Sequence, residues 1–506
     1  MKTAYEELLE IYEEIQLLNS ISGVLYWDLN TYIPPAAVNY RAKQFQYLST
    51  KTHKLWIDEK ISSLIESCEK DGSLDSFQIR NVELIKRSFD SRTIFPTELV
   101  GKLASQSNRT LEIWKKAKEK KDFQEVLPNM EKLFQLNVEA AELLAKSKGM
   151  NDPYNALIDR NDPGFSVDSL GKLFDEVKSF LVPFVIRCQD SDVKIDRSFL
   201  SRHVPRAAQV KMVRDLAEFL QYDSSSNKAN GRIDEVEHPL TIGCGYGDVR
   251  VTVKYHEDHV LSAFLAGAHE CGHAIHDLQG KAEWYNQPIY RVSSPSFGES
   301  QSRLLENVIA SSEEFWTFYY PKFQKATNGA FDDIDVNKFY SALNAVTPGF
   351  IRIQADEVTY ILHIIIRFEI EREWFAGNIT TKELPQIWNE KYKKYLGVAV
   401  PDDSLGLMQD LHWYSQYYGY FHGYGIGDII SAQITNTMSK KLPNWSDDLK
   451  EGNFTHIKQW LAENIHEKGG IYDGLELVKH ITNEPLSTKY FTNYIEKKFS
   501  KIYNLK

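Results

Sequence analysis

One short stretch of the sequence departs from the pattern of the rest, and two histidines follow it closely. Residues 248–255, DVRVTVKY, alternate polar and apolar side chains, and three of the apolar ones are valine. A period of two with β-branched residues predicts a half-buried strand. A helical pattern resumes at about Asp258 and includes AGAHECGHAIHDLQG at 266–280. The sequence therefore predicts a strand that leads directly into a helix bearing His269 and His273.

Most of the remaining chain has the periodicity of amphipathic helices. Apolar residues recur three and four positions apart, for example in 168–185 and 380–396. No fixed-period repeat and no Pro/Ser-rich linker interrupts this pattern, and the best loop candidate, 223–231, is too short to establish a domain boundary. We therefore predict a mostly α, large helical fold with one small β element next to the helix that carries the histidines.

Composition and charge exclude several classes of protein. A chain of 506 residues that is 42% apolar can bury a large core. The net charge of −11 argues against a phosphate-binding surface, so no nucleic-acid partner is expected. Four scattered cysteines do not form a disulfide framework, and the acidic N-terminus lacks the features of a signal peptide. The longest apolar run, 360–368, is too short to span a bilayer, so we expect a cytoplasmic protein without a membrane partner.

The spacing of His269, Glu270 and His273 matches a catalytic metal helix. Residues four apart share a helix face, so both imidazoles can reach one zinc ion while Glu270 addresses a water molecule beside it. A catalytic site needs a third protein ligand, and Glu299 lies 26 residues after His273. The alternative for Glu299 is a carboxylate that favours a helix N-terminus. His276 lies on nearly the same face as His269, but a fourth protein ligand would close the site.

Six motifs follow one another along the chain: HPL at 238–240, DVRVT at 248–252, HECGH at 269–273, ESQS at 299–302, IRIQAD at 351–356 and GLMQDLHW at 406–413. This ordered series resembles the carboxypeptidase Taq family of zinc metallocarboxypeptidases. Together with flanking stretches near both ends, the resemblance covers nearly the whole chain. Six ordered motifs are far more specific than the histidine motif alone.

The resemblance implies a groove-shaped single domain over 1–506, with an N-terminal helical part at about 1–230 and a zinc-site and substrate-groove part at about 231–506. It implies a homodimer that hydrolyses the C-terminal peptide bond of peptides with a free C-terminus, with broad specificity, by a zinc-activated water. The metal would be Zn²⁺, with Co²⁺ as the alternative. The implied residues are His269, His273 and Glu299 as ligands, Glu270 as general base, Arg352, His412 and Tyr424 at the substrate's C-terminal end, and His238 and Arg250 around the metal and groove.

Three departures from the family pattern bear on efficiency. Leu240 stands where the family usually has Phe, and Gly298 stands where it usually has His. His422 and Gly423 replace the Pro and Thr that usually precede Tyr424. Loss of a histidine next to a ligand predicts weaker metal binding. Loss of Pro and gain of Gly predict a looser loop at Tyr424.

Several alternatives stay open at this point. Arg352 and Asp356 are four residues apart, so a plain helical ion pair competes with carboxylate recognition. The polar face of strand 248–255 is either a solvated edge or a surface that pairs with extended substrate backbone. The oxyanion donor is either His238 or Tyr424. For the whole chain, the alternatives are an endo-acting zinc oligopeptidase and a non-catalytic zinc- or peptide-binding protein with a decayed site.

Overall fold

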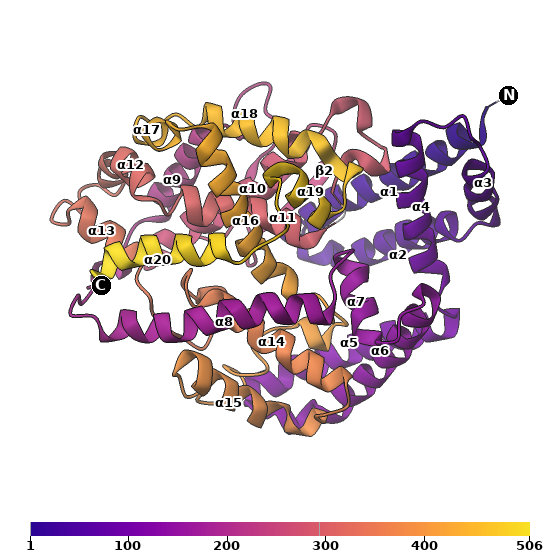
Figure 1. Cartoon of the computed structure of the whole chain (residues 1–506), viewed down its shortest axis with the longest axis horizontal. Coiled ribbons are helices and arrows are strands. Elements are labelled where there is room, and N and C mark those ends of the chain that lie inside the picture. Colours follow the sequence, from indigo (N-terminus) through magenta and orange to yellow (C-terminus); the bar gives the residue numbers. More distant parts are fainter. Residues whose placement is uncertain (1, 293, 506) are drawn as a thin grey trace.

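The computed structural model describes residues 2–292 and 294–505, which form twenty α-helices and one three-stranded sheet (Figure 1). The first nine helices are α1 (Ala4–Thr31), α2 (Val38–Trp56), α3 (Glu59–Glu69), α4 (Ser76–Thr93), α5 (Thr97–Lys120), α6 (Leu127–Lys148), α7 (Pro153–Asn161), α8 (Val167–Asp190) and α9 (Arg206–Phe219). The prediction of a mostly α fold with a small β element is confirmed.

The strands β1 (Ile233–Glu235), β2 (Leu240–Gly245) and β3 (Asp248–Val253) come next, and the chain is helical again from there to its end. The later helices are α10 (Val260–Leu278), α11 (Pro295–Arg303), α12 (Glu313–Ala326), α13 (Val336–Leu343), α14 (Tyr360–Phe375), α15 (Leu384–Leu396), α16 (His422–Lys441), α17 (Trp445–Lys450), α18 (Thr455–Asn464), α19 (Gly474–Thr482) and α20 (Lys489–Tyr503). The last helix, α20, packs beside α8, so segments far apart in the sequence lie together (Figure 1).

The predicted strand is β3, and it is the central strand of the sheet. The strand order is β1-β3-β2, with β1 parallel and β2 antiparallel to β3. Val249, Val251 and Val253 are at most 2% exposed, as the alternating pattern predicted. The polar face is only partly solvated, because Thr252 is fully buried and its hydroxyl exchanges hydrogen bonds with the backbone of Leu240.

Helix α1 packs against this sheet through Trp27. The indole is buried against Ile242 and Cys244 of β2, and its Nε1 donates to Asp234 Oδ2 at 2.9 Å. The guanidinium of Arg250 lies over the same ring, 4.4 Å from its centroid. The N-terminal helix and the small sheet therefore form one packed unit next to α10.

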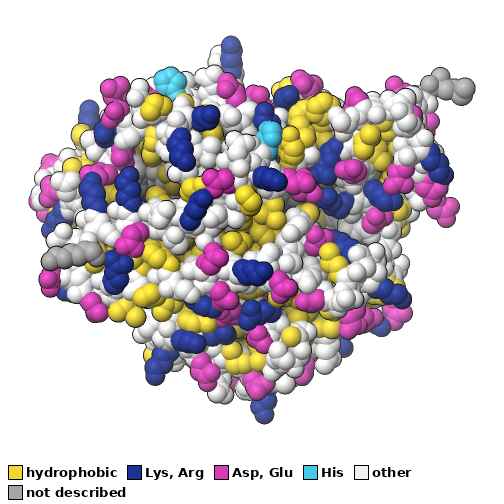
Figure 2. All heavy atoms as spheres, in the orientation of Figure 1, with side chains coloured by type: hydrophobic (Ala, Val, Ile, Leu, Met, Phe, Trp, Pro, Cys, Tyr) yellow, Lys and Arg dark blue, Asp and Glu magenta, His cyan; other side chains and the backbone are white. Residues whose placement is uncertain are grey.

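The apolar run 360–368 lies in the core. Every one of its residues is buried, within helix α14. Across residues 2–292 and 294–505, no helix combines the length and the apolar character needed to cross a membrane. On the face shown in Figure 2, Lys and Arg side chains are interspersed with Asp and Glu.

Candidate metal and substrate site

Three side chains from two helices converge at one point. Ligand atoms of His269 and His273 on α10 and of Glu299 on α11 all lie within 4.8 Å of one another. The His269 Nε2 atom is 3.7 Å from Glu299 Oε1, and the His273 Nε2 atom is 3.6 Å from Glu299 Oε2. The side chains are 21%, 29% and 12% exposed, so the cluster is accessible from one side. The structure thus brings together the three residues that the sequence analysis named as ligands.

Two glycines allow these helices to approach closely enough. A Cβ atom at Gly272 of α10 would lie 2.6 Å from the Ser302 Cα atom of α11. A Cβ atom at Gly427 of α16 would lie 2.9 Å from the Cβ and Cγ atoms of Glu299. Real side chains do not tolerate such distances to a backbone atom or a helical Cβ, so both positions require glycine. Glu299 is thereby held between α10 and α16.

The other face of the His269 ring is fixed by a chain of charged groups. His269 Nδ1 lies 2.9 Å from Oε2 of Glu306, and Arg303 Nη1 donates to the same oxygen at 2.8 Å. Arg303 in turn donates from Nε to Asp428 Oδ1 of α16, at 2.8 Å. Because the Glu306 carboxylate accepts from Nδ1, the Nε2 atom of His269 is directed toward Glu299 and His273.

Charge and burial explain how the isolated cluster titrates. Burial disfavours a charged ring, but the Glu299 and Glu306 carboxylates raise the pKa of His269 to about 9. Burial likewise opposes the charge on Glu306, yet Arg303 and His269 lower the pKa of Glu306 to about 2. For His273, burial and the neighbouring His269 hold the pKa well below its usual range. A bound cation would displace the proton that the raised pKa favours on His269.

Glu270 lies next to the cluster without being part of it. It is 8% exposed, and its Oε2 accepts a hydrogen bond of 2.6 Å from Thr241 Oγ1 of β2. Burial raises the pKa of Glu270, although His269 and the Thr241 hydroxyl act in the opposite direction. A carboxylate with a raised pKa is suited to accept and return a proton near neutral pH. Thr241, on the strand that precedes α10, was not identified from the sequence.

Arg352 does not pair with Asp356, so the helical ion-pair interpretation is wrong. Arg352 begins a short 3-10 helix, Arg352–Gln354, and Asp356 instead accepts hydrogen bonds from the backbone at the start of α14. The Arg352 guanidinium donates from Nη2 to Asp410 Oδ1 at 2.9 Å and from Nη1 to the Tyr360 hydroxyl at 3.2 Å.

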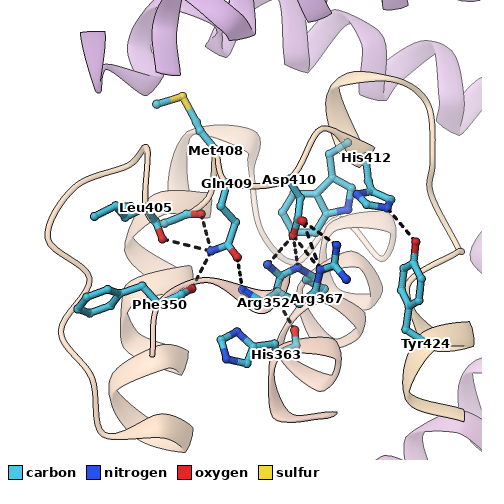
Figure 3. A network of polar contacts seen from close by, with 12 residues as sticks. Phe350, Arg352, His363, Arg367, Leu405, Met408, Gln409, Asp410, His412 and Tyr424 are labelled. Carbon is cyan, nitrogen blue, oxygen red and sulfur yellow. Dashed lines mark hydrogen bonds and ion pairs between the residues drawn. The ribbon is translucent and has the colours of Figure 1, made fainter. Parts of the chain in front are cut away.

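The same carboxylate binds a second arginine. Arg367 of α14 donates from Nε to Asp410 Oδ2 at 2.8 Å, and both guanidinium groups point at Asp410 (Figure 3). Burial opposes ionisation of Asp410, but Arg367 and Arg352 hold its pKa well below its usual range. Two guanidinium groups and one carboxylate carry a net charge of one positive unit. His412 adds no charge at neutral pH, because burial lowers its pKa to about 4. A buried surplus cation is suited to receive an anionic group.

His412 and Tyr424 complete this network. His412 Nε2 is 3.4 Å from the Tyr424 hydroxyl (Figure 3), and the Arg352 guanidinium lies over the Tyr424 ring, 5.0 Å from its centroid. Burial raises the pKa of Tyr424, with smaller contributions from Tyr420 and Glu299. Tyr424 lies one turn before Gly427 on α16, and a Cβ atom at Gly427 would lie 2.9 Å from the Glu299 side chain, so this helix connects the arginine network to the three-residue cluster.

The prediction of a looser loop before Tyr424 is wrong. Tyr424 lies in the first turn of α16, and His422 is fully buried, with its Nε2 atom 3.0 Å from Asp162 Oδ2. A second departure, Gly298, leaves open space: a Cβ atom there would meet nothing within 4 Å. The carboxylate partner of His269 is Glu306, so Gly298 does not remove that contact. Its effect on metal binding stays a prediction.

The structure does not place Arg250 and His238 in the three-residue cluster. Arg250 binds Asp248 at 2.6 Å and stacks on Trp27. Because β3 is paired on both sides, it cannot add an extended substrate strand, and that interpretation is wrong. His238 is exposed, between β1 and β2.

His276 lies apart from the metal cluster, as expected. Its ring packs at 4.9 Å from His466, and the grouping of His269, His273 and Glu299 found within residues 2–292 and 294–505 does not include it. The open fourth position that a catalytic site requires is therefore compatible with the side chains around it.

The donor set fits a divalent metal ion. Two imidazole nitrogens and one carboxylate oxygen, with a neighbouring carboxylate that does not ligate, form the set of catalytic rather than structural zinc sites. The support from Glu306 to the free nitrogen of His269 is the arrangement that orients such ligands. The sequence analysis missed Glu306, Arg303 and Asp428. Arg303 and Glu306 follow Glu299 closely in the sequence, but nothing local indicates Asp428, which lies on α16.

Comparisons with known proteins show the family of the chain. The family model described as carboxypeptidase Taq (M32) metallopeptidase matches residues 7–499. Carboxypeptidase 1 of Bacillus subtilis (strain 168) is 33% identical over 504 residues, which cover 99% of both chains. Thermostable carboxypeptidase 1 of Thermus thermophilus is 32% identical, also over 99% of both chains. Among solved structures, an M32 carboxypeptidase from Deinococcus radiodurans R1 aligns over 100% of both chains with a TM-score of 0.96 and 29% identity.

Proposed function

Because the chain belongs to the carboxypeptidase Taq (M32) family and is a metallocarboxypeptidase, we propose that it removes C-terminal residues with a Zn²⁺ ion held by His269, His273 and Glu299. The observation that carries this proposal is the convergence of these ligand atoms within 4.8 Å, with the Glu270 carboxyl beside them. Co²⁺ is the alternative metal, since the same donor types accept it.

When bound, the metal would supply Lewis acidity, which lowers the pKa of a water molecule and polarises a carbonyl group. The protein's own residues do the rest. Glu306, held by Arg303, fixes the orientation of His269 and keeps its Nε2 atom free for ligation. Gly427 leaves room for the Glu299 side chain beside α16.

Glu270 is the proposed general base. Its carboxyl takes the proton of the attacking water and later returns it to the leaving amine, which is typically worth roughly 10²–10⁴ in rate. The Thr241 hydroxyl holds one carboxylate oxygen at 2.6 Å, so the second oxygen is left for the proton transfer. Tyr424 is the proposed oxyanion donor in preference to His238, because it belongs to the network that includes Arg352.

The buried arginine network is the proposed recognition site for the substrate's terminal carboxylate. Arg352, Arg367 and Asp410 together carry one surplus positive charge, which a free C-terminus would neutralise. Arg352 is the proposed direct contact, with His412 and Tyr424 beside it. Arg250, stacked on Trp27, and the exposed His238 are proposed to act at the edge of the substrate path.

Two competing functions predict different products. An endo-acting oligopeptidase would cleave a peptide whose C-terminus is amidated, whereas a carboxypeptidase would not. A decayed binding protein would hold zinc and cleave nothing. Mass spectrometry of a mixed pool of free-acid and amidated peptides, with and without a chelator, tests all three. We expect chelator-sensitive ladders shortened from the free C-terminus only, with many different terminal residues removed.

The remaining proposals concern the whole protein. We propose that residues 1–506 act as one domain, with the division near residue 230 separating the helical N-terminal part from the part that carries the site. We also propose a homodimer, on the resemblance to the family alone, and a cytoplasmic location, as the sequence analysis predicts.

A further inference from the structure

Asp162 lies at a buried junction of three helices. It follows the last residue of α7 and is 1% exposed. Its Oδ1 accepts from Ser294 Oγ at 2.6 Å and from the Ser296 backbone N–H at 3.2 Å. Its Oδ2 accepts from Ser296 Oγ at 2.7 Å and is 3.0 Å from His422 Nε2. Because a carboxylate only accepts, the His422 Nε2 atom carries the hydrogen.

Two of these partners begin the helix that carries Glu299. Ser294 is the N-cap of α11, where its Oγ accepts from the Phe297 backbone N–H at 3.1 Å while donating to Asp162. Ser296 lies one residue into α11, and both its backbone and its hydroxyl bind Asp162. The carboxylate therefore fixes the first turn of α11, just before Glu299.

The third partner begins the helix that carries Tyr424. His422 is the first residue of α16, and its side chain is fully buried. A Cβ atom at the next residue, Gly423, would lie 3.5 Å from both Asp162 Oδ2 and Ser296 Oγ, which is ordinary contact. One turn later, Gly427 contacts the Glu299 side chain. The two helix starts are thus joined through one carboxylate.

We propose that Asp162 and His422 are positioning residues that fix Glu299 relative to Tyr424. They thereby fix the position of the metal site relative to the recognition site for the substrate's terminus. The inference rests on the proposed function, because it takes Glu299 as a ligand and Tyr424 as a substrate contact. His422 occupies one of the positions at which the chain departs from the family pattern.

A matched pair of amide variants tests the hydrogen bond itself. In His422→Gln the amide nitrogen falls near the place of Nε2, so it keeps the donor to Asp162. In His422→Asn the amide nitrogen falls near the place of Nδ1, so Asp162 loses its donor. The Nδ1 atom itself has no hydrogen-bond partner among the described residues. We expect His422→Asn to weaken zinc binding about tenfold and to raise KM for free-acid peptides, at the low end of the roughly 10–100-fold range for groups that support ligands. His422→Gln retains most of the zinc affinity.

A stability control separates positioning from general destabilisation. Tyr320 lies in α12, which takes no part in the site, and Tyr320→Phe removes its buried hydrogen bond of 2.7 Å to the Ile334 carbonyl. We expect it to lower Tm while leaving the zinc dissociation constant as in the unaltered protein. If it weakens zinc binding as much as His422→Asn does, the effect of His422 is general and the inference is overturned.

A ligand control separates this inference from the proposed function. If Glu299→Ala binds zinc as tightly as the unaltered protein, Glu299 is not a ligand and the proposed function fails at that residue. If Glu299→Ala loses zinc but both His422 variants bind it normally, only the positioning role is refuted. Equal weakening in His422→Gln and His422→Asn would also refute it, because the donor to Asp162 would then not be the cause.

Discussion

The Oγ1 atom of Thr241 on β2 lies 2.6 Å from Oε2 of Glu270 on α10 and 2.9 Å from the Glu270 backbone carbonyl oxygen, so its single hydrogen is shared between the two acceptors. A strand residue thus fixes both the side chain and the backbone of the proposed base. Its position explains why a small sheet accompanies the metal helix in an otherwise helical protein.

The base assignment predicts a specific kinetic defect. Glu270→Gln keeps the shape and the acceptor for Thr241 but cannot take a proton, so kcat should fall by roughly 10²–10⁴ with zinc content and KM little changed. Thr241→Val, the matched change on the strand, should lower kcat less, because the carboxylate remains. A fall in kcat of less than about tenfold in Glu270→Gln would show that another group is the base.

The recognition network predicts that Arg352→Lys is not conservative. Lysine keeps the charge but loses the planar fork, so about 1.5–3 kcal/mol of binding, or one to two decades of kcat/KM, should be lost for free-acid peptides. Arg367→Lys is the control: it also loosens Asp410, but its side chain is only 1% exposed and cannot reach a substrate. Equal losses in the two variants would show that Arg352 supports Asp410 rather than binding the peptide.

The metal-free protein should lose stability as the pH rises. The pKa of His269 is raised to about 9 from an unfolded value of 6.5, so its contribution is complete below pH 6.5 and disappears as the pH passes through 9. The shift corresponds to about 3 kcal/mol. Urea unfolding of the metal-free protein between pH 6.5 and 9.5 should show this decline, and His269→Gln should flatten it. The same slope in both proteins would assign the effect to other groups.

The proposed homodimer has a direct test. Sedimentation of the protein at micromolar concentration should give twice the chain mass of 58.4 kDa. A species of the chain mass across that concentration range would contradict the dimer and leave the catalytic proposal untouched.

The sequence indicated that His269 and His273 lie together because short-range helical spacing determines their positions. The relative positions of His269, Glu270 and His273 follow from α10 alone. The alternating valines predicted strand β3. Arg352 was harder, because its partner Asp410 lies 58 residues away and only the tertiary structure brings them together. The strand order likewise depends on the tertiary structure. Nothing in 248–255 indicates that β3 is the central strand, with no free edge for a substrate strand.

His422 shows the same limit at a single position. A change from Pro to His next to Gly423 indicates a looser backbone when only local propensity is considered. The structure buries His422 against Asp162, a residue 260 positions away. Local rules could not anticipate that partner.

The most direct test of the central claim is an anomalous difference map from crystals of the zinc-loaded protein, with data collected on both sides of the zinc absorption edge. The account predicts one strong peak about 2.0–2.2 Å from Nε2 of His269, Nε2 of His273 and a carboxylate oxygen of Glu299, with the Glu270 carboxyl outside the ligand set. A peak ligated by Glu270 in place of Glu299, or zinc bound at another position with this cluster empty, would contradict it.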